Sequence, residues 1–200
     1  MTDDHDAGTH EHTHDSHPDD PDHQHGHDDH QGHEDHHHHD VESLGVAVLT
    51  VSSSRSLDDD PAGDVIEAAF ESADHTVVTR DLVRDAYDSI QGNVQRLVSR
   101  DDTDVVVTTG GTGITPDDVT VEAIEPLLDK ALPGFGELFR QRSRDDIGTR
   151  VVGTRATAGV ADGVPIFCLP GSENAARLGA EDIIVPEAPH LAGLATRDDT

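Results

Sequence analysis

Residues 44–51 and 164–169 are almost continuously apolar, and 104–109 contains three consecutive valines at 105–107. A strand with one face in water alternates apolar and polar residues, whereas a strand covered on both faces is apolar throughout. A fourth strand is expected over 76–83, where β-branched residues recur. The pattern predicts strands of a mostly parallel sheet that is covered on both sides, and this constrains the fold more than any other feature.

Helical patterns lie between these strands. Apolar residues recur at helical spacing from Ala62 to Ala73, which predicts an amphipathic helix. Pro116, preceded by a capping Thr115, is expected to begin another helix. Several glycines leave the secondary structure of residues 145–160 ambiguous. Strand–helix alternation of this kind predicts a three-layer α/β/α sandwich with right-handed crossovers. The remaining helices are expected over 90–98, 116–128, 135–139 and 173–183, and a last short segment over 187–195 completes the domain.

Charge divides the chain into regions. Residues 1–40 hold 13 of the 42 acidic residues, 14 of the 16 histidines and no Lys or Arg. Such a segment has too little apolar surface to offset the entropy of the chain, so we expect a disordered tail. Residues 41–195 are expected to form one globular domain, and residues 196–200 a disordered C-terminus.

The net charge of −29 excludes some classes of partner. Nucleic acid and anionic membranes would repel so acidic a protein. The sequence has neither an apolar run of about 18 residues nor a secretory signal, and its single cysteine, Cys168, is expected in the core. These features predict a soluble, cytoplasmic protein. Because 12 of its 13 basic residues are Arg and acids are in large excess, adaptation to concentrated salt is also expected.

Small and hydroxyl-bearing residues follow the predicted strands. The first strand is followed by Ser52, the third by 108–113 (Thr-Thr-Gly-Gly-Thr-Gly), and the fourth by Pro170, Gly171 and Ser172. Ligands of parallel sheets bind beyond the carboxyl ends of the strands, and glycine turns expose N–H groups that bind phosphates. No Lys follows the last glycine, so this is not a P-loop. The alternative is a tight turn with no ligand.

Two acidic residues are candidates for binding Mg²⁺. Asp85 follows the second strand and Asp118 follows the glycine turn. Mg²⁺ is commonly bound by one or two carboxylates together with substrate phosphates. The alternative is that Asp118 caps a helix and Asp85 is solvated. The other acids near these loops (Asp58, Asp59, Asp60 and Asp117) and the two histidines of the domain (His75 and His190) are expected at the surface.

Four ordered motifs resemble the MoaB/Mog family of molybdenum cofactor biosynthesis, especially its MoaB branch. They are Thr-Thr-Gly-Gly-Thr-Gly at 108–113, Asp-Val-Thr at 118–120, Pro-Gly-Phe-Gly-Glu at 133–137 and Leu-Pro-Gly-Ser at 169–172. The resemblance covers about 44–185. It implies an α/β/α sandwich that assembles as a homotrimer or hexamer. It also implies adenylyl transfer from Mg-ATP to the terminal phosphate of molybdopterin, with release of pyrophosphate, before a partner inserts molybdate or tungstate.

The resemblance also implies roles for individual residues. Asp118 and Asp85 resemble the catalytic, Mg²⁺-binding aspartates. Ser52 and Glu137 are expected in the substrate pocket. At 60–63 the family often has Asp-(Thr/Lys)-Ser-Gly, whereas this chain has Asp-Pro-Ala-Gly and lacks the hydroxyl. The residues expected to bind the phosphates of the nucleotide and molybdopterin are Thr109, Gly110, Gly111, Thr112, Gly113, Gly171 and Ser172.

The histidine-rich tail allows a further interpretation. His36, His37, His38 and His39 follow alternating His and acidic residues, and neutral imidazoles bind Zn²⁺, Ni²⁺ and Cu²⁺. A solubilising tail, such as a protein of a halophilic archaeon could carry, is the simpler alternative. Three functions therefore remain open: an adenylyltransferase, a non-catalytic molybdopterin carrier, and a metal-handling protein that depends on its tail.

Overall fold

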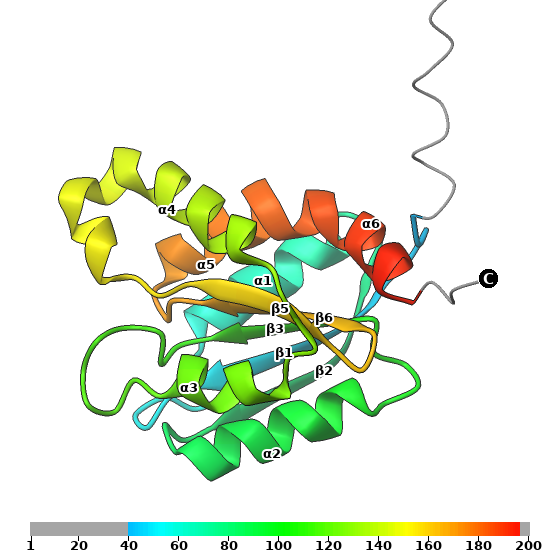
Figure 1. Ribbon diagram of the computed structural model, residues 1–200, viewed down its shortest axis with the longest axis horizontal. Helices are drawn as coiled ribbons and strands as arrows, with labels where there is room; N and C mark the ends of the chain where they lie inside the picture. Colours follow the sequence, from blue (N-terminus) through cyan, green and yellow to red (C-terminus); the bar gives the residue numbers. More distant parts are fainter. Residues whose placement is uncertain (1–39, 197–200) are drawn as a thin grey trace, which may run out of the picture. The chain divides into compact units, whose positions relative to one another are not determined.

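A computed structural model describes residues 40–196, and in this part of the chain a six-stranded sheet lies between two layers of helices (Figure 1). The strand order is β2-β1-β3-β6-β5-β4, with β1 parallel to β2 and β3, and β3 parallel to β6. β5 runs antiparallel to both of its neighbours. The predicted α/β/α sandwich with a mostly parallel sheet is confirmed. The strands are β1 (Gly45–Val51), β2 (Thr76–Val83), β3 (Val105–Thr109), β4 (Lys130–Ala131), β5 (Thr157–Ala161) and β6 (Val164–Leu169).

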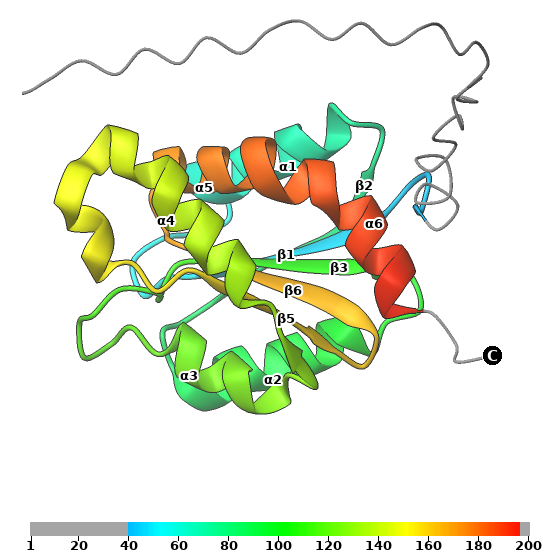
Figure 2. The same cartoon turned by 45° about the horizontal axis from the view of Figure 1, so that its top comes forward.

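The helices cover the two faces of the sheet unequally, as Figure 2 shows: α1, α4, α5 and α6 lie on one face, and α2 and α3 on the other. Neighbouring residues of β1 serve opposite faces. Val46 and Val48 pack against the four-helix face, whereas Ala47 and Leu49 pack against α2 and α3. The α-helices are α1 (Pro61–Glu71), α2 (Tyr87–Val98), α3 (Thr120–Ile124), α4 (Pro133–Ile147), α5 (Glu173–Gly179) and α6 (Val185–Ala195). The other helical turns are η1 (Glu125–Leu127), η2 (Gly148–Gly153) and the π-helical η3 (Ala180–Ile184).

Two strands were missed by the sequence prediction. β5 lies in the ambiguous stretch 145–160, and it pairs with the two-residue β4. Gly159 explains the weak strand signal: a Cβ atom there would lie 2.5 Å from Leu128 Cδ1 and 2.6 Å from the carbonyl oxygen of Lys130. Close packing therefore requires the small residue that lowers the strand score.

The helix predicted to begin at Pro116 is wrong. Residues 113–117 form bends and a turn, and α3 begins only at Thr120. Asp118 closes this turn, because its backbone N–H donates to the carbonyl of Thr115 (3.0 Å) and its carboxylate accepts hydrogen bonds from Thr115. An Asp that bonds its own backbone neighbourhood competes with helix formation. The helix expected over 135–139 is also longer, spanning all of α4.

Two polar residues predicted at the surface are buried, and those predictions are wrong. Asp60 is only 1% exposed, because it caps α1 and pairs with Arg80, whereas Asp58 and Asp59 are exposed as expected. His75 is 9% exposed and packs against the ring of Phe70. A charge or imidazole on a loop gives no sequence sign of the partners that permit its burial. The prediction for Cys168 is confirmed, since the thiol is buried and its pKa is raised by desolvation to about 12.

The burial of His75 gives a pH-dependent stability. Desolvation lowers its pKa below the ordinary value of 6.5, although the charge of Asp74 opposes the shift. The unfolded chain therefore binds this proton more readily, and the free energy of unfolding decreases as the pH falls below about 6.5, by up to about 1.4 kcal/mol per pH unit. Denaturant unfolding at several pH values should show a smaller decrease for His75→Gln than for wild type. His190→Gln, at a half-exposed histidine that pairs with Asp40, is the control; identical slopes in all three proteins would contradict the assignment.

Residues 1–39 and 197–200 lie outside the described part of the chain. The predictions of a disordered tail over 1–40, of transition-metal binding by His36–His39 and of a disordered C-terminus over 196–200 concern these residues, apart from Asp40, which pairs with His190, and Thr196, whose N–H donates to Ala192. In residues 40–196, no helix is both long and apolar enough to cross a membrane. The same residues contain no group of three or more His, Cys, Asp or Glu side chains suited to a metal ion.

Candidate functional site

A cavity of about 610 Å³ lies at the carboxyl edge of β1, β3 and β6. Its position follows from the topology. The chain passes from β1 to β2 on one side and then to β3 on the other, and loops diverge where the strand order reverses, which leaves a crevice. The cavity is lined by residues 51–55, Asp85, 110–113, Asp118, Arg150, 153–154 and 170–171.

The glycine turn after β3 forms the floor of this cavity. Gly110 and Gly111 have φ angles of 102° and 65°, in the region that favours glycine. A Cβ on Gly110 would lie 2.1 Å from the carbonyl oxygen of Val51, so no side chain fits. The N–H of Gly110 donates to Leu169 (2.9 Å), whereas those of Gly111 and Thr112 have no acceptor among the described residues. Two adjacent backbone donors are thus available to an anion.

Asp118 lies at the edge of the same turn. Its Oδ2 accepts hydrogen bonds from the backbone N–H and the hydroxyl of Thr115, at 2.8 and 2.6 Å. Partial burial by itself would raise the pKa of Asp118. The hydrogen bonds from Thr115, a contact with the Gly113 N–H and the charge of Arg155 outweigh this effect, so the pKa is lowered overall. The carboxylate is therefore ionised at neutral pH and suited to a divalent cation.

Arg155 stabilises the turn through hydrogen bonds to its backbone carbonyls. Its backbone N–H donates to Thr112, its Nε donates to the carbonyl of Gly113 (2.7 Å), and its Nη2 donates to the carbonyl of Asp118 (2.9 Å). Its Nη1 also forms an ion pair with Glu122. One side chain from the segment before β5 thereby fixes both ends of the 113–118 loop.

Removal of this side chain should loosen the loop. We expect Arg155→Ala to raise amide hydrogen exchange at Thr115 and Asp118 by about tenfold or more, because three hydrogen bonds made by a charged group are lost. The exposed Arg144 of α4 provides the control substitution Arg144→Ala. Exchange rates at Thr115 and Asp118 that match in wild type and Arg155→Ala would rule out this role for Arg155.

The second predicted aspartate lies in the same cavity. Asp85 accepts a hydrogen bond from the hydroxyl of Ser53 (2.8 Å), which connects the loops after β1 and β2. The hydroxyl of Ser52 accepts from the backbone N–H groups of Ser54 and Arg55 and orders the loop after β1. Ser52, Asp85, Asp118, the turn 110–113 and Gly171 are therefore brought together.

Three other predicted site residues lie elsewhere. Thr109 is buried beneath the turn, where its hydroxyl donates to the carbonyl of Pro170 (3.0 Å). Ser172 caps α5 and lines a separate cavity between α4 and α5. Glu137 is exposed on α4 and lines a neighbouring cavity of about 520 Å³. The structure does not bring these three side chains into the main cavity.

Several cavity residues were not among the predicted site residues, and Arg55, Arg150 and Thr154 are three of them. Arg55 follows the serines after β1, and Arg150 and Thr154 come from the stretch around η2 that its glycines made ambiguous. Arg55 could have been found from its position directly after the predicted first strand. The positions of Arg150 and Thr154 depend on how α4 ends, and no local pattern in the sequence indicates this.

Comparisons with known proteins agree with this architecture. Residues 47–190 match the family model described as a probable molybdopterin binding domain. The molybdenum cofactor biosynthesis protein B of Staphylococcus epidermidis is 45% identical over 150 residues, which cover 73% of this chain and 85% of the relative. That of Escherichia coli K12 is 42% identical over 142 residues, which cover 71% and 84%.

Solved structures give the same result. A crystal structure of molybdenum cofactor biosynthesis protein B has a TM-score of 0.76 and 38% identity, covering 79% of this chain and 99% of that one. The tungsten cofactor synthesizing protein MoaB from Pyrococcus furiosus has a TM-score of 0.71 and 36% identity, covering 78% and 99%. The predicted halophilic origin stays a prediction. The chain belongs to the MoaB/Mog family of molybdenum cofactor biosynthesis.

Proposed function

We propose that this protein transfers the adenylyl group of Mg-ATP to the terminal phosphate of molybdopterin and releases pyrophosphate. The observation that carries the proposal is that one cavity is lined both by Gly111 and Thr112, whose N–H groups have no acceptor among the described residues, and by Asp118 with its ionised carboxylate. Donors of this kind suit phosphate oxygens. A carboxylate beside them would repel a phosphate unless a cation lay between the two.

Both reactants of this transfer are anions. An oxygen of the molybdopterin phosphate forms a bond to the α-phosphorus of ATP, while the bond from that phosphorus to the oxygen bridging to the β-phosphate breaks. Pyrophosphate leaves with the electron pair of that bond. Since the attacking oxygen is already ionised, no side chain has to serve as a nucleophile. The N–H groups of Gly111 and Thr112 bind and orient phosphate oxygens, which is catalysis by positioning and by stabilisation of charge.

The donor set of the cavity fits Mg²⁺. Asp118 and Asp85 are the carboxylates that line it in the described part of the chain, and Mg²⁺ commonly takes one or two protein carboxylates, with phosphates and waters completing its shell. Bound there, Mg²⁺ would neutralise charge that otherwise separates the two phosphates. Asp118 is held in place for this role by Thr115, and Asp85 by Ser53.

The proposal includes the remaining expectations from the resemblance. They are assembly as a homotrimer or hexamer, a partner that inserts molybdate or tungstate, and a cytoplasmic site of action. The names of the relatives support a product in molybdenum or tungsten cofactor synthesis.

Sedimentation of the purified full-length chain should give three or six times the mass of 21.4 kDa; a monomer at micromolar concentration would contradict the proposed assembly.

A reaction with purified components tests the proposed activity. The full chain is incubated with molybdopterin and Mg-ATP, and adenylylated molybdopterin and pyrophosphate are measured together. The proposal predicts that both appear in equal amounts and that neither forms without Mg²⁺. Binding of molybdopterin with no consumption of ATP would instead support the non-catalytic carrier.

A further inference from the structure

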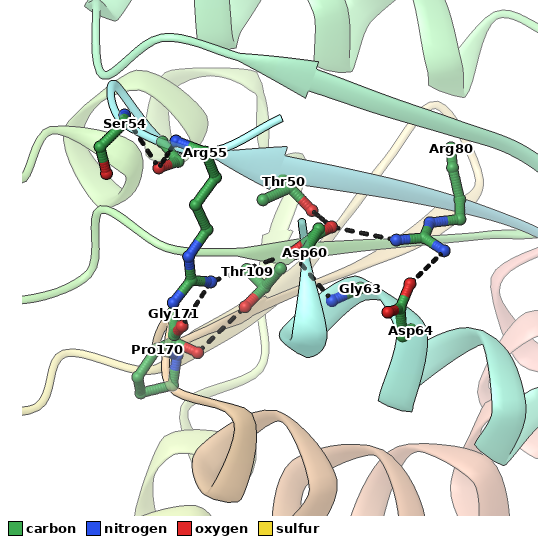
Figure 3. A network of polar contacts seen from close by, with 11 residues as sticks. Thr50, Ser54, Arg55, Asp60, Gly63, Asp64, Arg80, Thr109, Pro170 and Gly171 are labelled. Carbon is green, nitrogen blue, oxygen red and sulfur yellow. Dashed lines mark hydrogen bonds and ion pairs between the residues drawn. The ribbon is translucent and has the colours of Figure 1, made fainter. Parts of the chain in front are cut away.

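Arg55 is an anchored cation at the mouth of the cavity, and neither the comparisons nor the family motifs assign it a role. It lies in the loop after β1, and Figure 3 shows its side chain extending toward Pro170 and Gly171. Its Nη1 donates to the carbonyl of Gly171 (3.0 Å) and lies 3.9 Å from Oδ1 of Asp60. Its Nε and Nη2 have no hydrogen-bond acceptor among the described residues. The side chain is 34% exposed, so these donors are within reach of a ligand in the cavity.

Asp60 lies near Arg55, but its hydrogen bonds go to other groups. Its buried carboxylate accepts hydrogen bonds from the Thr50 hydroxyl (2.6 Å), the Gly63 N–H (3.2 Å) and Nη2 of Arg80 (3.1 Å) (Figure 3). Arg80 is therefore the direct counter-charge of Asp60, and Arg55 is the more distant one. Since an ion-pair energy falls with distance and with exposure to solvent, much of the charge of Arg55 remains available.

The electrostatics of the domain make this charge important. Residues 41–200 contain 29 acidic and 13 basic residues, so a polyanionic ligand is repelled at long range. Among the described residues that line the cavity, Arg55 and Arg150 are the only basic ones. Arg150 is exposed and its side chain has no partner within residues 40–196, whereas the side chain of Arg55 is hydrogen-bonded to the loop after β6. A guanidinium held in place presents a planar pair of donors that matches two phosphate oxygens.

We propose that Arg55 binds a phosphate oxyanion of the substrate, acting with the backbone donors of the glycine turn. The inference rests on the proposed function in one respect, namely that the ligand is a phosphate ester. The phosphate could belong to the nucleotide or to the pterin. In either case the ligand bridges the loop after β1 and the turn after β3, and Arg55 supplies the positive charge that a P-loop would obtain from its lysine.

Titration calorimetry with pyrophosphate tests this contact without requiring catalysis. Arg55→Gln should weaken binding of pyrophosphate about 10- to 100-fold, and Arg55→Lys should weaken it less, because the charge is kept and the fork is lost. Arg142→Gln is the matched control. It removes one positive charge from an exposed position on α4 outside the cavity, and we expect less than a twofold change.

A purely structural role would give a different pattern. If Arg55 only tied two loops together, Arg55→Gln would lower the thermal midpoint while the folded protein bound pyrophosphate as wild type does. That result would overturn the inference. The KM values for ATP and for molybdopterin, measured separately for Arg55→Lys, identify the source of the phosphate, since only the KM of the substrate that carries it should rise.

The two proposals can fail independently. If wild type binds pyrophosphate through Arg55 but forms no adenylylated product, the inference stands and the proposed activity falls. If wild type forms the product while Arg55→Gln binds pyrophosphate equally well, the activity stands and the inference falls.

Discussion

Asp118→Asn should reduce adenylyl transfer by about 100- to 1,000-fold, which is typical when one preorganised electrostatic group is removed from an active site. Asparagine has the same shape, and its side-chain oxygen still accepts the hydrogen bonds from Thr115. The loop therefore keeps its conformation, and the change removes only the negative charge. Binding of molybdopterin should change only a few-fold, because the backbone donors of the turn remain.

The adjacent residue provides the control for this experiment. Asp117 is exposed and does not line the cavity, so Asp117→Asn makes the same change in net charge one position away. We expect wild-type rates from Asp117→Asn. An Asp118→Asn protein that forms product at the wild-type rate would contradict the catalytic role of Asp118, and absence of product from all three proteins would support a carrier.

Gly110→Ala should cause the largest loss of stability among single substitutions near the site. The backbone there has φ of 102°, and the new Cβ would lie 2.1 Å from the carbonyl oxygen of Val51. The contact is with the backbone of a central strand, so a side-chain rotation cannot relieve it. We expect the free energy of unfolding to fall by about 2–4 kcal/mol, from strain and from displacement of the turn, and phosphate binding should be lost with it.

A glycine-to-alanine substitution within a helix is the control, because it shows how stability changes where the new Cβ meets no obstacle. Gly92 lies within α2, and a Cβ there would meet no atom within 4 Å. Gly92→Ala should therefore increase the free energy of unfolding, by up to about 1 kcal/mol. Denaturant unfolding of both variants measures the difference. Equal stability of Gly110→Ala and wild type would show that the turn adapts and would contradict the rigid geometry described above.

The sandwich could be predicted because its strongest signals are local. The apolar run that became β1 packs Val46 on one face and Ala47 on the other, as a strand buried on both sides must. The prediction failed where tertiary contacts outweighed local preference. Gly159 reads as a strand breaker but is required by the approach of Lys130. In the sequence, Asp118 suggests the start of a helix, but in the structure it closes a turn that precedes α3.

The candidate site was predictable to a similar extent. The glycine turn, Asp85 and Asp118 could be singled out because loops at the carboxyl ends of parallel strands converge. Arg155 was missed because its partners are the backbone carbonyls of Gly113 and Asp118, which lie far from it along the chain, whereas the position of Arg55 directly after the first predicted strand could have indicated it. The burial of Asp60 was not predicted because its counter-ion, the side chain of Arg80, belongs to the next strand.

The central claim is that phosphate oxygens bind to the N–H groups of Gly111 and Thr112, which have no acceptor among the described residues. A crystal structure of the protein with Mg²⁺ and a non-hydrolysable ATP analogue tests this most directly. The account predicts phosphate oxygens within hydrogen-bond distance, about 2.7–3.2 Å, of the nitrogens of Gly111 and Thr112, with Mg²⁺ bound by Asp118. A nucleotide bound elsewhere, with both nitrogens left to solvent, would contradict it.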